Sequence, residues 1–392
     1  MDKKVVENKI RRSVKQVHDR NQKRLDKKTT SFISLRIQYN LSIRNQKTNE
    51  EFQISDIENY MDESPVALIG GPGAGKSTLL LKMAVQLSEK NLDNCAAMIP
   101  IYVQCGLLSS YDRLEDEIHL SGYSEEEKKY LWENGKLCLL FDGINEAVNV
   151  EMGKLLRDVV NLSEEYPECR YVINCRAIEF PIWASSYFEP YSILPVKDEQ
   201  IRTQFCKEFG DVTGEKYYTE LINSSHNYLF ELCKNPLLLS LVIRIISQSM
   251  DSIEEFSFSQ IKGKGDIYRE FCRSLIQHEL KKIKRERESY FEIIRDRLFT
   301  TLAYYMQANN KVYISREEME VVIRNMPYGK GRETDYIKFI SSSSSGEKSL
   351  WYREIAEDVI KSSFFNLHLL ETKESVYISF IHQSFQEFYA GK

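Results

Sequence analysis

The sequence predicts an α/β fold, in which a parallel sheet carries helices on both faces, followed by two or more α-helical subdomains. Two observations lead to this prediction. Between Pro65 and about Val196, short apolar runs alternate with segments of helical spacing, as they do in a parallel sheet with crossover helices. Beyond residue 197, almost every segment has helical periodicity.

Apolar runs in the α/β region predict its strands, and helical spacing predicts the helices between and after them. The predicted strands are Val66–Ile69, Met98–Val103, Leu137–Phe141, Tyr171–Asn174 and Tyr191–Leu194. The predicted helices include Thr78–Ala84, Glu151–Glu165, Asp198–Glu208, Tyr228–Leu232, Pro236–Gln248, Ile267–Lys284 and Tyr290–Asn309. A further strand is expected over Ser31–Ser42, where apolar and polar residues alternate.

The first 30 residues are rich in Lys and Arg and predict a helix. A thin apolar stripe runs along this helix through Val5, Val6, Ile10, Val14 and Val17. We interpret it as a solvated helix that docks by its stripe. The alternative is a basic helix that binds nucleic acid or acidic lipid.

Composition excludes some classes of protein. The chain has 392 residues and a net charge of -5, which gives no global case for nucleic-acid or membrane-surface binding but leaves local basic patches open. Its eight cysteines are scattered without paired or metal-ligand spacing, so reduced thiols are expected. No apolar stretch approaches the roughly 18 residues of a membrane helix, and the N-terminus is polar. We therefore expect a cytoplasmic protein.

A glycine-rich loop follows the first predicted strand and opens the next helix, as a Walker A phosphate loop does. Glycines let backbone N–H groups turn toward a β-phosphate, and Lys76 supplies a positive charge between the β- and γ-phosphates. The hydroxyl of Ser77 is placed to ligate Mg²⁺. The residues of the loop, all expected to bind nucleotide, are Gly70, Gly71, Pro72, Gly73, Ala74, Gly75, Lys76, Ser77 and Thr78. The fold class is therefore that of a P-loop NTPase.

A second acidic motif completes this predicted site. Asp142 follows the buried run Leu137–Phe141 and is the expected Walker B ligand of Mg²⁺. Glu146, four residues later, is placed to polarise the water that attacks the γ-phosphate. The strand near Ile99–Val103 lies in sequence between the two motifs and favours the ATPase class that uses such a glutamate.

The run Phe141-Asp142-Gly143-Ile144-Asn145-Glu146 resembles the extended Walker B motif of the NACHT branch of the STAND nucleotide switches, which are related to AAA+ ATPases. Asn145 departs from that motif, because an aspartate is usual at its position. One carboxylate is therefore missing, and we expect hydrolysis to be slow. The resemblance covers about residues 60–392.

Three more motifs of this family follow in the expected order. Val172-Ile173-Asn174-Cys175-Arg176 resembles the sensor-1 strand, and the resemblance implies that Arg176 senses the γ-phosphate. Lys234-Asn235-Pro236-Leu237-Leu238-Leu239 resembles the motif whose proline packs against adenine, here Pro236. The run from Phe380 to Ala390 is similar to the winged-helix motif in which a histidine, here His382, reaches the β-phosphate of ADP.

The resemblance implies four regions and a switching function. The regions are an N-terminal helical and linker region at 1–60, a P-loop NTPase core at 61–196, a helical subdomain at 197–285 and a winged-helix subdomain at 286–392. ADP would hold a closed form, and exchange for ATP would allow self-association. An effector and a trigger of unknown identity are implied, in antiviral or innate defence. Both flanks are short for this family, so we expect part of a longer protein.

Two rival functions remain open on sequence alone. One is an AAA+-like DNA-handling ATPase, in which the basic cluster Lys281–Arg285 contacts DNA, although a solvated helix face explains the cluster better. The other is a nucleotide-binding scaffold without hydrolysis, as Asn145 allows.

Overall fold

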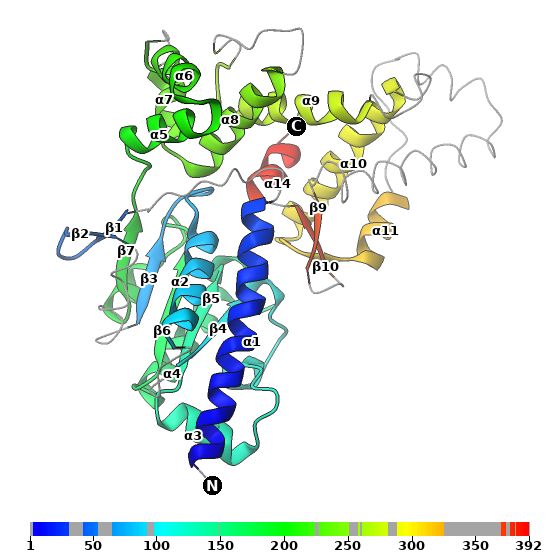
Figure 1. The fold of residues 1–392 in the computed structure, drawn as a ribbon. Helices are drawn as coiled ribbons and strands as arrows, with labels where there is room; N and C mark the ends of the chain where they lie inside the picture. Colours follow the sequence, from blue (N-terminus) through cyan, green and yellow to red (C-terminus); the bar gives the residue numbers. More distant parts are fainter. Residues whose placement is uncertain are drawn as a thin grey trace. The chain divides into compact units, whose positions relative to one another are not determined.

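The structure is a computed structural model, drawn in Figure 1, and its chain divides into two compact units. Unit 1 comprises Met1–Gln204 and Cys233–Leu237, and unit 2 comprises Phe205–Leu232 and Leu238–Lys392. The residues that the structure describes are 3–30, 42–53, 65–91, 98–147, 149–223, 227–250, 258, 261–280, 288–324, 370–373, 377–380 and 382–391.

Unit 1 is built on a seven-stranded sheet with the strand order β2-β1-β7-β3-β6-β5-β4. Five strands are parallel: β3 (Val66–Ile69), β4 (Ile99–Gln104), β5 (Leu137–Asp142), β6 (Arg170–Cys175) and β7 (Glu189–Ile193). A hairpin of β1 (Ser42–Asn45) and β2 (Glu51–Gln53) extends the sheet antiparallel to β7. The predicted parallel α/β fold is confirmed, and β3 lies between β6 and β7 rather than at an edge.

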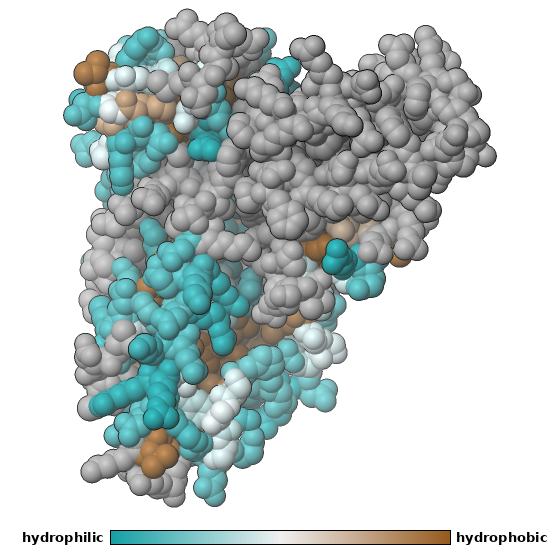
Figure 2. Space-filling view, turned by 45° about the vertical axis from the view of Figure 1, so that its right-hand side comes forward, coloured by the Kyte–Doolittle hydropathy of each residue, from teal (hydrophilic) through white to brown (hydrophobic). Residues whose placement is uncertain are grey.

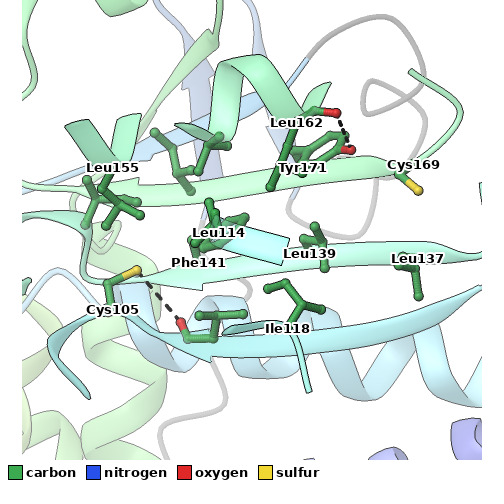
Figure 3. Close-up of a cluster of buried hydrophobic side chains, with 14 of the residues drawn as sticks. Cys105, Leu114, Ile118, Leu137, Leu139, Phe141, Leu155, Leu162, Cys169 and Tyr171 are labelled. Carbon is green, nitrogen blue, oxygen red and sulfur yellow. Dashed lines mark hydrogen bonds between the residues drawn. The ribbon is translucent and has the colours of Figure 1, made fainter. Parts of the chain in front are cut away.

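Helices cover both faces of this sheet because the strands are apolar on both sides. Helix α2 (Lys76–Asn91) packs on the face that carries Leu68 and Leu140. Helix α4 (Met152–Glu165) packs on the opposite face, where Leu139 and Phe141 meet Leu155 (Figure 3). Alternate residues of one strand therefore enter two separate cores.

Helix α1 (Lys3–Thr30) lies beside α2 and the edge strand β4 (Figure 1). Val6, Ile10 and Val14 are at most 3% exposed, as the apolar stripe predicts, whereas Val5 is 50% exposed and does not belong to it. Exposed charged side chains occupy the other side of the helix: Arg11, Arg12, Lys15, Arg20 and Lys23. The described surface in Figure 2 is likewise mostly hydrophilic.

Two polar contacts join α1 to helix α3 (Glu125–Glu133) and the loop before it. Lys9 Nζ donates to the two carboxylate oxygens of Glu127 at 2.7 and 2.8 Å, and the hydroxyls of Ser13 and Tyr123 are 2.8 Å apart. The α3 helix was not predicted from the sequence. The helix α1 is thus an integral part of unit 1.

Unit 2 holds the remaining helices and a second sheet. The helices are α5 (Asp198–Phe209), α6 (Asp211–Asn223), α7 (Asn227–Cys233), α8 (Pro236–Met250), α9 (Lys264–Leu280), α10 (Glu288–Ala308), α11 (Arg316–Arg324) and α14 (Gln383–Ala390), of which α5, α7 and α8 each have residues in both units. The small antiparallel sheet has the order β8 (Ile314–Ser315), β10 (Tyr377–Phe380) and β9 (Leu370–Lys373). The helical character of this region was predicted, but the sequence analysis gave no separate bounds for α6, α11 and α14.

Some sequence-based expectations fall outside the described residues. They are the strand at 31–42, apart from Ser42, and the basic cluster at 281–285. The four-region division and the winged helix stay predictions. The seven cysteines that the structure describes are free thiols. In the parts of the chain that the structure describes, no helix combines the length and apolar character needed to cross a bilayer.

The end of α3 yields a stability prediction. Gly135 has φ of +59°, and a Cβ there would lie 2.3 Å from the Glu168 carbonyl oxygen. Gly135→Ala should therefore lower the free energy of unfolding by about 2–4 kcal/mol. Gly122 has φ of +90° but open space around it, so Gly122→Ala should cost about 1 kcal/mol. Urea unfolding measures both, and equal losses would contradict the role of the Glu168 contact.

Candidate nucleotide site

The predicted phosphate loop, Gly70–Thr78, joins the end of β3 to the start of α2. Gly73 and Gly75 have φ of +75° and +91°, a region that L side chains rarely adopt, so this path favours glycine. The first N–H groups of a helix lack partners within the helix. The start of α2 can therefore receive an anion, as predicted for this loop.

Lys76 closes over its own loop. Its Nζ donates to the carbonyl oxygens of Gly70 at 2.8 Å and Gly71 at 3.0 Å. Burial lowers the pKa of Lys76, while the negative charges of Glu146 and Asp142 oppose this shift. The ammonium group therefore restrains the loop through hydrogen bonds to two carbonyl oxygens. Phosphate oxygens of a nucleotide could take the place of these acceptors.

Asp142 is the last residue of β5. Because side chains alternate between the two faces of a strand, it lies on the same face as Cys138 and Leu140, which is the face that α2 covers. Both of its carboxylate oxygens accept hydrogen bonds from neighbouring strands. The hydroxyl of Tyr102, from β4, donates to Oδ2, and Nδ2 of Asn174, from β6, donates to Oδ1 at 2.5 Å. Two donors on opposite sides thus orient this carboxylate.

Asn174 has a second role at the same place. Its Oδ1 accepts from the Gly143 N–H at 2.6 Å, and the residue is 1% exposed. It therefore ties the loop after β5 to the end of β6. The sequence analysis missed both Asn174 and Tyr102 as site residues. A buried amide within the apolar run Tyr171–Cys175 was the available signal for Asn174, whereas Tyr102 offered none.

Glu146 lies in a short 3-10 helix, η4 (Ile144–Glu146), directly after Gly143. Gly143 has φ of +72°, and a Cβ there would lie 2.7 Å from Cδ of Glu146. The Glu146 side chain therefore folds back against Gly143, where the positive φ favours glycine. Asn145 lies between Gly143 and Glu146 in the sequence and is half-buried.

Arg176 follows β6, and its side chain is 17% exposed with Nη1 3.7 Å from Oε1 of Glu179. Its positive charge lowers the Lys76 pKa further, beside the larger effect of burial. The structure therefore brings Lys76, Asp142, Glu146 and Arg176 into one electrostatic environment. Burial also raises the pKa of the neighbouring Cys175 thiol to about 12, so this thiol stays protonated and is no nucleophile.

Asn235 holds the other side of the loop. Its Nδ2 donates to the Pro72 carbonyl at 2.9 Å, while its Oδ1 accepts from Leu237 N at 3.1 Å and caps α8. Pro236 opens that helix at its first position, where a missing N–H costs nothing. A Cβ on Gly73 would lie 2.8 Å from Asn235 Oδ1. Asn235 is thus a further loop contact that the sequence analysis did not single out.

His382 belongs to unit 2, where it is the N-cap residue of α14. Its Nδ1 accepts from the Ser384 N–H at 3.0 Å. A neutral imidazole that accepts at Nδ1 carries its proton on Nε2. A neutral His382 with this hydrogen bond would have its N–H at Nε2, and its contact with ADP stays a prediction.

The residues present fit Mg²⁺ together with a nucleotide. Within the described ranges, no three His, Cys, Asp or Glu side chains gather as a metal site. Mg²⁺ commonly takes one or two carboxylates, with phosphates and waters completing its coordination. Asp142 and the hydroxyl of Ser77 offer that kind of partial ligand set.

Comparison with known proteins adds one domain match. Residues 64–211 match the family model of the NACHT domain. No curated protein is detectably similar to the chain in sequence.

Three similar solved structures share little sequence with this chain. Cdc6p from Pyrobaculum aerophilum is 12% identical over 86% of this chain and 91% of its own, with a TM-score of 0.34. A STAND protein with a tetratricopeptide repeat sensor from Pyrococcus horikoshii is 13% identical with a TM-score of 0.40, over 86% of this chain but only 41% of its own. Orc1 of Aeropyrum pernix, solved in complex with DNA, is 13% identical over 84% of this chain and 87% of its own, with a TM-score of 0.32. Values this low carry no information on activity.

Replacing Asn174 tests the bridge between β5 and β6. Asn174→Leu keeps similar volume but leaves the Gly143 N–H and one Asp142 oxygen without their partner, so the free energy of unfolding should fall by about 1–3 kcal/mol. Urea unfolding without nucleotide measures the loss. Asn161→Leu, on the exposed side of α4, is the matched control and should change stability by less than about 0.5 kcal/mol. An equal effect of the two changes would rule out the bridge.

Proposed function

We propose that this chain, which contains a NACHT domain at residues 64–211, is an ATP- and ADP-controlled switch that hydrolyses ATP slowly and self-associates when ATP is bound. NACHT domains are nucleotide-binding P-loop NTPase domains. One observation supports the proposal above all others. The glycine-rich loop, Lys76, Asp142 and Glu146 meet at the carboxyl edge of a parallel sheet, where such folds bind their ligands.

In this proposal the loop binds the phosphates through backbone N–H groups at the start of α2. Lys76 leaves the carbonyl oxygens of Gly70 and Gly71 and turns to the β- and γ-phosphates. Its partly desolvated ammonium group favours a negatively charged partner over the neutral carbonyls it contacts in the structure. Nucleotide binding therefore exchanges one set of Lys76 contacts for a stronger set.

Ser77 and Asp142 would hold Mg²⁺, and bound Mg²⁺ offsets the negative charge of the phosphates. Asp142 is already oriented by Tyr102 and Asn174. Glu146 would orient the attacking water and accept its proton. Asn145 supplies no charge beside it, which fits slow rather than fast hydrolysis.

The remaining residues would distinguish ATP from ADP. Arg176 would detect the γ-phosphate, a role supported by its electrostatic influence on Lys76. Pro236 would pack against adenine, and its neighbour Asn235 contacts the phosphate loop. His382 would donate from Nε2 to the β-phosphate of ADP. A switch needs this kind of differential contact, since a ligand shifts an equilibrium only by its difference in affinity for the two states.

We propose self-association of the ATP-bound form as the output, in antiviral or innate defence and from a cytoplasmic location. The trigger and the effector are separate partners of unknown identity. The winged-helix assignment of residues 286–392 is part of the same proposal. Its described elements are α10, α11, α14 and the small antiparallel sheet.

Nucleotide binding is tested by Lys76→Ala. The change removes a charge from the loop and little volume from the core, so affinity for ATP and ADP should fall at least about a hundredfold while the fold persists. Calorimetric titration gives the affinity, and circular dichroism checks the fold. Lys90→Ala, on the exposed end of α2, should leave the affinity unchanged. Unchanged affinity in Lys76→Ala would refute the phosphate-loop assignment.

Switching is tested by Glu146→Gln, which should keep ATP bound and uncleaved. With ATP and Mg²⁺ this variant should form larger species than the ADP-bound protein, as light scattering behind a sizing column can show. Asp142→Ala should lose Mg²⁺-dependent binding and stay monomeric. A monomer in both nucleotide states would instead favour the alternative of a nucleotide-binding scaffold.

A further inference from the structure

Tyr102 connects the N-terminal helix to the carboxylate at the candidate nucleotide site. On one side, its hydroxyl donates to Oδ2 of Asp142. On the other, the guanidinium carbon of Arg24, in the last part of α1, lies 5.6 Å from the centre of the Tyr102 ring. That distance is within the range of a cation–π contact. A continuous path of contacts therefore runs from Arg24 through Tyr102 to Asp142.

Strand register explains why Tyr102 reaches this carboxylate. In the parallel pair of β4 and β5, Tyr102 lies opposite Leu140, and Asp142 is two residues farther along on the same face. The Tyr102 ring packs against the core beneath α2. Its hydroxyl thus points along the sheet toward the end of β5, where the predicted metal ligand lies.

The position of Arg24 is set by the packing of α1 along its length, including the buried Asn21 less than one turn away. The helix α1 is anchored by Val6, Ile10 and Val14, which are buried, and by the Lys9–Glu127 ion pair. Because β4 is the edge strand of the sheet, α1 also covers an edge that would otherwise lie open. Movement of α1 would therefore change what Tyr102 contacts, and it would also change the packing of α1 against α2.

We propose that Tyr102 is a positioning residue for Asp142, and that the docking of α1, through Arg24, sets how well the site holds Mg²⁺. A carboxylate has about four lone-pair sites, so hydrogen bonds from Tyr102 and Asn174 orient Asp142 and still leave it able to bind a metal or its waters. The positive charge of Arg24 over the ring favours donation by the Tyr102 hydroxyl toward the negative carboxylate.

This inference rests on the proposed function, since it assigns Asp142 to Mg²⁺. It adds a regulatory input at the N-terminal helix. Because coupling between two sites is reciprocal, binding of Mg²⁺ and nucleotide should also favour the docked helix. A partner that pulls α1 away would weaken metal binding, and a partner that holds α1 in place would strengthen it.

The first experiment uses Tyr102→Phe, which keeps the ring under Arg24 and removes only the hydroxyl. Calorimetric titration of ADP at a series of Mg²⁺ concentrations, and in EDTA, separates metal binding from nucleotide binding. Apparent Mg²⁺ affinity should fall about tenfold, the loss typical of a group that orients a metal ligand. ADP affinity in EDTA should not change. A further fall in ADP affinity in the presence of Mg²⁺, when Tyr102→Phe is added to Asp142→Asn, would show that Tyr102 does not act through Asp142.

The second experiment tests the helix. Arg24→Met removes the charge over the ring. It should lower the apparent Mg²⁺ affinity about threefold, the size of effect expected from loss of one cation–π contact. Arg24→Lys keeps a cation and should restore most of the affinity. Arg20→Met changes an exposed residue one turn away on the same helix and is the matched control. Equal effects of Arg20→Met and Arg24→Met would refute the helix input.

A nucleotide-free measurement separates failure of this inference from failure of the proposed function. Urea unfolding of wild type, Tyr102→Phe, Asp142→Asn and the double variant should show about tenfold coupling in the unfolding equilibrium constant, as expected for a hydrogen bond to a charged group. Coupling without nucleotide binding by wild type would contradict the nucleotide site and leave the Tyr102–Asp142 link standing. Absence of coupling, or unchanged Mg²⁺ affinity in Tyr102→Phe, overturns the inference.

Discussion

The hydrogen bonds that hold Asp142 at the end of β5 are the interaction on which the arrangement of unit 1 depends most. They join three adjacent parallel strands, because Tyr102 comes from β4 and Asn174 from β6. Asn174 also holds the N–H of Gly143, from which the backbone turns to place Glu146. Orientation of the carboxylate and the path of the loop after it therefore have a common origin in strand register.

The phosphate loop is held in a similar way from two sides. Lys76 donates to the carbonyl oxygens of Gly70 and Gly71 at the start of the loop, and Asn235 donates to the carbonyl oxygen of Pro72. Asn235 is also the N-cap of α8, so one side chain shapes both the loop and the beginning of a helix. A nucleotide that draws Lys76 toward its phosphates would change one of these restraints and keep the other. The loop is thus pre-formed on one side and adjustable on the other.

The N-terminal helix belongs physically to the α/β unit. Its apolar stripe is buried, it covers the edge strand β4, and its Arg24 lies over the ring whose hydroxyl binds Asp142. A basic helix with an exposed charged side would usually suggest an electrostatic partner. In this protein the buried side of the helix bears on the candidate site, because its Arg24 contacts Tyr102, which binds the candidate metal ligand Asp142.

Local patterns in the sequence alone predicted the phosphate loop, Asp142 as a metal ligand and the five parallel strands, of which the structure confirms the strands. Glycine spacing and short apolar runs extend over only a few residues, so they can be recognised in the sequence without knowledge of the fold. The roles of Tyr102, Asn174 and Asn235, the hairpin of β1 and β2, and the place of β6 between β3 and β5 emerged only in the tertiary structure. Each of these depends on which distant segments become neighbours, and strand order and register decide that through packing of the whole unit rather than through any local pattern.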